Sequence, residues 1–420
     1  MKSFRLFVSF MILTFLLSAC KAEKISGSVL DEQGPVVGAL VRVQTTDMHT
    51  RTNDDGYFTL SNTSGYITAW ASGYYINGTE AAPGEEIEIY LEAYTDADNP
   101  DYEWLPSTHH NREREDQGCA TCHSNVNNNI TFTLPADEWL LDAHSQSARN
   151  PRFLTMYTGQ DVQGNQSPPT RYGYSRDYGS FPLRPDLTQP YYGPGYKLDF
   201  PDTAGNCAAC HTPLSAVDDP YGVDPRTLTG VDLEGISCDL CHKIWDVRLD
   251  PATGLPGANM PGVLSFSFRR PPADHQLFIG PLDDVAPGED TYSPLQRESE
   301  FCAPCHFGVF WNTVIYNSFG EWLESPYAAP ETGQVCQDCH MPPLGANQFA
   351  ITEAGGKERD PMTIFSHRMP GAADEELLQN ALTMNVNAQR KDDKVIVEVE
   401  LINDKTGHHI PTDSPLRHMI

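Results

Sequence analysis

The chain has 420 residues and a formal net charge of −29 at pH 7, with 33 prolines and 32 glycines. This length fits two or three domains, and so acidic a chain argues against binding to nucleic acid and against direct adhesion to anionic lipid. The charge favours steering of basic redox partners, although an ordinary acidic surface would look the same.

The first residues have the composition of a secretory signal. A basic start precedes a short apolar run over residues 7–17, which is too short to span a bilayer comfortably. The run leads into Leu17-Ser18-Ala19-Cys20, which resembles a bacterial lipoprotein box. The resemblance implies a signal peptide of residues 1–19 and lipid attachment to Cys20. An ordinary signal peptide followed by an incidental cysteine is the alternative.

The expected location follows from this segment. The resemblance to a lipoprotein implies export and a lipid anchor in the membrane. A lysine, Lys21, follows Cys20 where an aspartate would resemble an inner-membrane retention signal. We therefore expect an outer-membrane anchor, on either the periplasmic or the cell-surface face.

Residues 20–95 read as a small all-β domain. They contain no cysteine after Cys20, and apolar and polar residues alternate in short runs at 25–30, 41–44, 56–60, 66–70 and 87–91. Turn residues separate these runs, which is the pattern of an antiparallel sandwich. The order of the turn and strand residues resembles carboxypeptidase-regulatory-like domains. These modules are spacers or adhesion units, so we expect no chemistry here, and we expect His49 to be exposed.

Residues 96–372 contain a pentapeptide, Cys-x-x-Cys-His, that occurs five times. It accounts for every cysteine except Cys20. The ten cysteines are Cys119, Cys122, Cys207, Cys210, Cys238, Cys241, Cys302, Cys305, Cys336 and Cys339. The histidines that follow them are His123, His211, His242, His306 and His340. The motif is the attachment signature of a c-type haem, in which two thiols bind the porphyrin and the adjacent histidine is the proximal iron ligand. The expected cofactor is therefore five covalently bound haems c.

Other uses of paired cysteines explain this pattern less well. Two Cys-x-x-Cys units can hold zinc, but zinc does not require a histidine after every second cysteine. A redox dithiol is a lone motif in an alternating strand–helix pattern, and structural disulfides give no reason for the histidines. The two short intervals between motifs, second to third and fourth to fifth, predict two closely stacked haem pairs.

Each iron has a second axial position, and the remaining histidines are candidates for it. The distal candidates are His109, His110, His144, His275, His367, His408 and His409, with His418 as a spare. His144 is the strongest candidate, because it lies in a predicted helix and a helix gives the rigid placement that a haem ligand needs. Pro135 and early acidic residues predict the start of this helix, and Pro151 is expected to end or kink it near Asn150. Of the last pair, His408 is preferred to His409. Methionine ligation stays open, although the supply of histidines makes it unnecessary.

Residues 373–420 change character again. A short helix is expected over 374–381, and apolar alternation at 382–386 and 395–401 around a polar turn predicts a β-hairpin. A lone hairpin is marginally stable, so this part reads as the start of a second β module in a fragment of a longer protein. A short sheet docked on the haem region is the alternative. The expected architecture is an N-terminal β-sandwich, a mostly irregular central multihaem domain with short helices, and a C-terminal hairpin.

Together, the haem motifs, Ala143-His144-Ser145, Ser366-His367-Arg368 and the Gly-His-x-x-Pro-Thr segment at 407–412 resemble exported multihaem c-type cytochromes. The nearest resemblance is to the hydroxylamine-oxidoreductase and cytochrome-nitrite-reductase superfamily in the broad sense, over residues 100–415. It implies stacked, mostly bis-histidine haems that act as wires between respiratory partners. In the pentahaem nitrite reductases one motif ends in lysine and leaves an open iron, whereas all five motifs here end in histidine.

Three functions stay open. The first is a non-catalytic electron-transfer protein that passes electrons outward to another cytochrome, a mineral or a soluble acceptor. The second is a multihaem oxidoreductase with one open iron, acting on a small nitrogen or sulfur compound. The third is a homo-oligomeric filament that conducts through stacked haems. The number of distal candidates favours the first.

Overall fold

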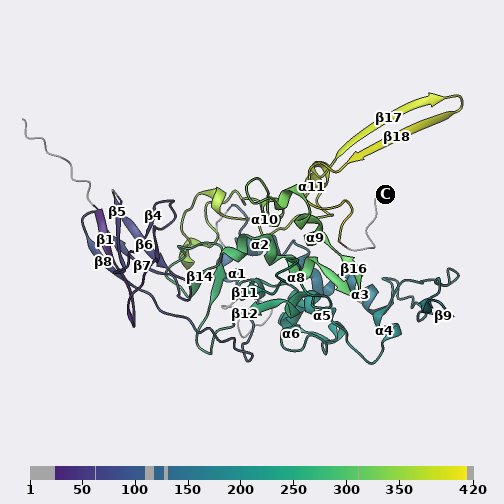
Figure 1. The fold of residues 1–420 in the computed structure, drawn as a ribbon, viewed down its shortest axis with the longest axis horizontal. Helices are drawn as coiled ribbons and strands as arrows, with labels where there is room; N and C mark the ends of the chain where they lie inside the picture. The colour runs from purple at the N-terminus through teal and green to yellow at the C-terminus, as the bar shows by residue number, and fades with distance from the viewer. Residues whose placement is uncertain (1–23, 62, 109–117, 127–130, 311, 414–420) are drawn as a thin grey trace, which may run out of the picture.

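The computed structural model describes residues 24–413, except for residue 62, 109–117, 127–130 and 311. It has the predicted three-part architecture of a β-sandwich, an irregular central region with short helices, and a terminal hairpin (Figure 1). No helix in these ranges is long and apolar enough to cross a membrane.

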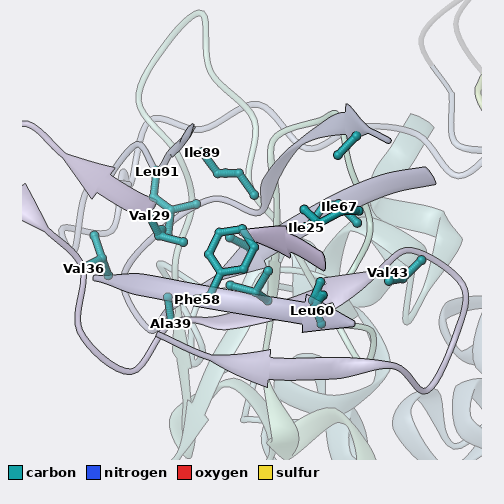
Figure 2. Close-up of a cluster of buried hydrophobic side chains, with 13 residues drawn as sticks. Ile25, Val29, Val36, Ala39, Val43, Phe58, Leu60, Ile67, Ile89 and Leu91 are labelled. Atoms are coloured by element: carbon teal, nitrogen blue, oxygen red, sulfur yellow. The ribbon is translucent and has the colours of Figure 1, made fainter. Parts of the chain in front are cut away.

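The N-terminal region is a sandwich of two four-stranded sheets. One sheet contains β1 (Lys24–Asp31), β2 (Gly34–Pro35), β5 (Tyr57–Ser61) and β8 (Glu86–Tyr90), and the other has the order β4 (His49–Arg51), β3 (Leu40–Val43), β6 (Gly65–Trp70), β7 (Asn77–Ala81). Alternate residues of β1 and β5 are buried, as period-2 strands with one covered face require. Figure 2 shows the resulting core, in which Phe58 is surrounded by aliphatic side chains from both sheets.

The central region is built from short helices, most of them of one turn, and two-stranded ribbons. Its α-helices are α1 (Ala120–His123), α2 (Pro135–Trp139), α3 (Pro151–Thr158), α4 (Tyr196–Asp199), α5 (Ala208–His211), α6 (Pro213–Ala216), α7 (Cys238–Cys241), α8 (Ala303–His306), α9 (Ser318–Leu323) and α10 (Cys336–His340). Its strands are β9 (Tyr172–Ser175), β10 (Gly179–Pro182), β11 (Ile244–Val247), β12 (Phe266–Phe268), β13 (Phe278–Gly280), β14 (Asp290–Tyr292), β15 (Gly308–Phe310) and β16 (Thr313–Tyr316). Short 3₁₀ turns connect them, including η2 (His144–Arg149).

The helix predicted around His144 is interrupted twice. The α2 helix ends at Trp139, and His144 begins the 3₁₀ turn η2 instead of continuing α2. The α3 helix then starts at Pro151, with the side chain of Asn150 accepting hydrogen bonds from the backbone of residues 152 and 153. Proline at the first helical position and an asparagine cap are typical helix starts, so Pro151 opens a new helix.

The sandwich is docked on the central region through polar contacts and through aromatic contacts such as those of Trp70 with Tyr292 and of Tyr94 with Trp245. The Arg42 guanidinium donates to Asp283 at 2.6 and 2.8 Å. The Thr45 backbone N–H donates to Asp284 at 2.7 Å, and the buried Arg359 donates to the same carboxylate at 2.8 Å. The rings of Trp70 and Tyr292 meet edge to face at 5.0 Å. Asp284 thus joins the two regions directly.

A hairpin projects from the body (Figure 1), and residues 403–413 follow it and contact the body through Glu321. The α11 helix (Glu375–Asn380), capped by Asp374, precedes β17 (Thr383–Lys391) and β18 (Lys394–Ile402). Cross-strand partners such as Val386 and Val399 share a face, yet both strands are exposed along most of their length.

Candidate cofactor site

All five Cys-x-x-Cys-His motifs fold as a single helical turn. The turns are α1, α5, α7, α8 and α10. The backbone N–H of His123 donates to Cys119 at 3.0 Å, and that of His242 donates to Cys238 at the same distance. One turn places residues three and four apart on one side, so the two thiols and the imidazole of each motif are presented together.

The thiols of different motifs lie next to one another, and the ten cysteines of the motifs are free of disulfides. The Cys238 thiol contacts Cys119 and, together with burial, raises the pKa of Cys119. In the same way Cys336 raises the pKa of Cys302, and Cys210 raises the pKa of Cys305. The first motif is therefore next to the third, the second next to the fourth, and the fourth next to the fifth.

Sequence spacing pairs the second motif with the third and the fourth with the fifth, and Ala208 and Ala209 of the second motif share a buried apolar cluster with Leu240 of the third. The fourth and fifth motifs are neighbours, but the sulfur contacts of the second motif are with the fourth. The first motif approaches the third because the Ser107 hydroxyl accepts from the Cys238 N–H at 3.1 Å. Ser299 does the same for the Cys336 N–H at 2.9 Å, so two motif pairs are held by the same kind of contact.

Three of the proximal histidines have their Nδ1 atoms bonded to backbone carbonyls. His123 Nδ1 lies 2.8 Å from the Phe349 oxygen, His242 Nδ1 lies 2.8 Å from the Ile279 oxygen, and His340 Nδ1 lies 2.7 Å from the Pro370 oxygen. A carbonyl partner fixes the proton on Nδ1 and leaves Nε2 as a free ligand atom. These histidines are thus in the tautomer that metal binding requires.

Two distal candidates face proximal histidines at a spacing that fits an iron. The ring centroids of His144 and His306 are 6.2 Å apart, and those of His340 and His408 are 6.3 Å apart. An iron held by two imidazole nitrogens at about 2 Å, one on each side, separates the centroids by about 6 Å. His144 therefore pairs with the fourth motif and His408 with the fifth.

His367 lies near two proximal histidines. Burial lowers the pKa of His367 to about 4, and the nearby His242 and His123 act in the same direction. Its Nδ1 faces the Phe365 carbonyl at 3.0 Å, and the Glu138 carboxylate on α2 accepts from its backbone N–H at 2.8 Å. Its Nε2 is thus oriented like those of the proximal histidines.

The other distal candidates are placed differently. His275 is half exposed and its Nδ1 lies 3.0 Å from a carboxylate oxygen of Glu289. His409 is 78% exposed and faces Glu321, so it points to solvent where His408 points to His340. His109, His110, His418 and Cys20 lie outside the described residues, and His49 is exposed on β4.

The second motif has a different environment. His211 stacks flat on Phe153, with centroids 3.9 Å apart and an interplanar angle of 3°. Burial lowers the pKa of His211 to about 4 against an opposing contact with the Ser147 backbone, and its buried Nδ1 makes no well-aligned hydrogen bond within the described residues. Among the described residues, no histidine ring pairs with His211 at the spacing seen for His306 and His340.

The sequence interpretation missed several residues that position the histidines. The Asp142 carboxylate contacts His144, and Glu321 accepts from the His409 N–H at 2.9 Å and from the Thr412 hydroxyl at 2.6 Å. The contact of Asp142 with His144 could have been predicted, because the two residues are only two positions apart in the sequence. No signal in the sequence connects Glu321 with residues 409–412.

The side chains present fit covalent haem better than zinc. Free thiols occur in pairs with an adjacent imidazole, and two imidazole pairs leave the room that an iron needs. In the described part of the chain, no three His, Cys, Asp or Glu side chains converge as a zinc site would need.

No family model and no curated protein matches the chain. Among solved structures, a penta-heme cytochrome c552 from Thermochromatium tepidum aligns with a TM-score of 0.41 and 18% identity, covering 71% of this chain and 67% of that one. A type II cohesin–X-dockerin complex mutant from Acetivibrio cellulolyticus aligns with a TM-score of 0.16 and 14% identity, covering 17% of this chain and 58% of that one. Likenesses of this strength do not establish a shared fold or family.

Proposed function

We propose that this chain is a pentahaem c-type cytochrome that transfers electrons at the cell envelope. Five attachment motifs, each folded as one helical turn, together with two histidine pairs at 6.2 and 6.3 Å, are the observations that support it. Haem supplies a reversible one-electron couple when bound, and two histidines on one iron favour electron transfer over substrate binding.

The residues of this chain have separate roles in the proposal. The ten motif cysteines attach the five porphyrins, and His123, His211, His242, His306 and His340 are the proximal ligands. His144 and His408 fill two distal positions, and His367 is the candidate for a third. Backbone carbonyls hold the proton on Nδ1 of His123, His242 and His340, which leaves Nε2 of these three histidines as the ligand atom.

We also propose that the protein is exported and held by a lipid on Cys20 at the outer membrane. The first described strand, β1, begins at Lys24, so the sandwich would stand next to the anchor as a spacer. The net charge of −29 supports basic redox proteins as partners. Within this proposal, the electrons would pass outward to an extracellular acceptor, either through single chains or through a filament of such chains.

The ligand assignment is tested by electron paramagnetic resonance of the oxidised holoprotein. We expect His144→Ala and His408→Ala each to convert one low-spin signal into a high-spin signal. The exposed His49→Ala is the control and should leave the spectrum unchanged. Unaltered low-spin signals in both site variants, with the haem content preserved, would rule out these two ligands.

The environment of His211 favours a second candidate, an oxidoreductase with one open iron. The ring that contacts His211 is Phe153, and the remaining histidine candidates for that iron, His109 and His110, lie outside the described residues. This candidate predicts one high-spin signal in the unmodified protein that shifts when azide is added. Five low-spin signals and no response to azide would exclude it.

A further inference from the structure

We propose that the haem held between His306 and His144 has the lowest reduction potential in this chain. A carboxylate lies near the Nδ1 atom of each of these two imidazoles. The inference rests on the proposed function and concerns how the protein tunes one of its haems. The carboxylates are Asp142 and Asp413, and neither belongs to a Cys-x-x-Cys-His motif.

The stronger contact is that of Asp142. Its Oδ1 atom lies 2.6 Å from Nδ1 of His144 and accepts from the backbone N–H of the same residue at 2.8 Å. The Asp142 side chain is only 3% exposed. Water therefore screens its charge poorly, and the imidazole is the charged group's nearest hydrogen-bond partner.

The second carboxylate approaches from the proximal side. Asp413 Oδ1 lies 3.9 Å from Nδ1 of His306, and Ser318 donates a hydrogen bond to it at 3.5 Å. The contact is longer than that of Asp142, and Asp413 is 23% exposed. We therefore assign it the smaller of the two effects.

Four of the other paired or proximal histidines have neutral partners at the same atom, and His211 is the exception. His123, His242 and His340 face backbone carbonyls at 2.7–2.8 Å, and His408 faces the His409 carbonyl at 3.0 Å. A carboxylate partner makes a ligating imidazole more basic than a carbonyl partner does. A more basic axial ligand stabilises the oxidised iron, which lowers the reduction potential. The pair with two carboxylates should thus be the last to be reduced.

The position of this pair gives the difference a functional consequence. The thiols of the fourth motif contact those of the second and fifth motifs, and Gln296, six residues before Cys302, donates to the Cys241 carbonyl at 3.0 Å. The fourth motif therefore has the second and fifth motifs as neighbours, and the segment before it contacts the third. A low potential at the fourth haem would make it the last of the five haems to accept an electron.

The test is a potentiometric titration of the holoprotein followed by electron paramagnetic resonance. Asp142→Asn keeps a hydrogen-bond acceptor and removes the charge. We expect the potential of one haem to rise by about 59 mV, a tenfold change in its ratio of reduced to oxidised form, while its signal stays low-spin. The haem that shifts should be the one whose signal becomes high-spin in His144→Ala, and the last to be reduced in the unmodified protein.

Asp137→Asn is the matched control. Asp137 lies within α2 and is a partly buried carboxylate, whereas Asp142 is buried, and Asp137 accepts from Ser124 and Asn125 instead of a histidine. It should leave all five potentials in place. If Asp142→Asn yields too little holoprotein, Asp413→Asn should give a smaller rise at the same haem.

Two results would overturn the inference. One is a protein with five haems whose potentials are unchanged in both Asp142→Asn and Asp413→Asn. The other is a haem between His306 and His144 that is reduced before the other four. A haem content below five, or no low-spin signals, would instead count against the proposed function. The two failures are therefore distinguishable in the same samples.

Discussion

The sandwich and the motif region are stabilised by different means. The sandwich packs one continuous aliphatic core from both sheets, with Phe58, Ile25 and Ile67 almost fully buried. The motif region has smaller apolar clusters, and it buries charged groups such as Lys243 and Asp239, both fully covered. The sandwich is stabilised by its own apolar core. The motif region has less apolar core of its own, as expected if haems supply the rest.

The short helices of the motif region also indicate that it needs packing partners that the sandwich does not need. The five motif helices have four or five residues each, and the longest α-helix in the described residues, α3, has eight. Isolated helices shorter than about 12 residues are marginal in water, so these turns need packing partners. We infer that the porphyrins are those partners and provide much of the missing apolar core.

The largest expected effect comes from withholding haem. Protein made without haem maturation should lose the structure of α1 to α10 but keep the sandwich, whose core is complete by itself. Hydrogen exchange followed by mass spectrometry would show protected amides in β1, β3, β5 and β6 and unprotected ones in the motif region. Equal protection in both regions would show that the motif region folds without haem.

A core substitution in the sandwich should act on stability alone. Phe58 is 2% exposed at the centre of the aliphatic cluster. Phe58→Ala should destabilise the sandwich by about 3–5 kcal/mol, because it removes buried apolar surface and leaves a cavity. Denaturant unfolding monitored by far-UV circular dichroism measures the loss, and the haem absorption spectrum of the native protein should not change.

A smaller, pH-dependent effect is expected at Asp290 in the motif region. Burial raises the pKa of Asp290 to about 7 from its ordinary 3.8. Between these values the folded chain binds more protons at this group than the unfolded chain, so stability falls as pH rises through that window. Asp290→Asn should therefore be more stable than the unmodified protein by about 1–3 kcal/mol at pH 8 and equal to it near pH 3. The same difference at both values would contradict the assignment.

The smallest effect is expected on the hairpin. Val397 is 55% exposed on β18 and faces Ala388 across the strands. Val397→Ala should change stability by less than about 0.5 kcal/mol, because it uncovers no buried surface. A loss comparable to that of Phe58→Ala, measured in the same denaturant titration, would mean that the hairpin face is covered in solution.

The sequence was most informative where the pattern is local. Alternation predicted the strands β1, β3, β5, β6 and β8, and apolar runs around a polar turn predicted the final hairpin. The strand β7 was missed because Asn77-Gly78-Thr79-Glu80 has no apolar alternation, and it is held by its pairing with β6. The short β4, His49–Arg51, was missed for the same reason.

The site was predictable only in its local part. The five motifs define cysteines and proximal histidines without a structure, since all are contiguous. Neighbour relations between motifs depend on contacts such as Ser107 with Glu234, 127 residues apart, which no local pattern encodes. The approach of His408 to His340 likewise depends on contacts of Glu321 with residues 88 and 91 positions away.

We propose that the motif region is organised around five covalently attached haems. A pyridine haemochrome spectrum of the purified exported protein, combined with the mass of the intact chain, measures this directly. We expect five haems for each chain, with no free thiol among the ten motif cysteines. A smaller number of haems in fully matured protein, with motif cysteines found as thiols or disulfides, would contradict it.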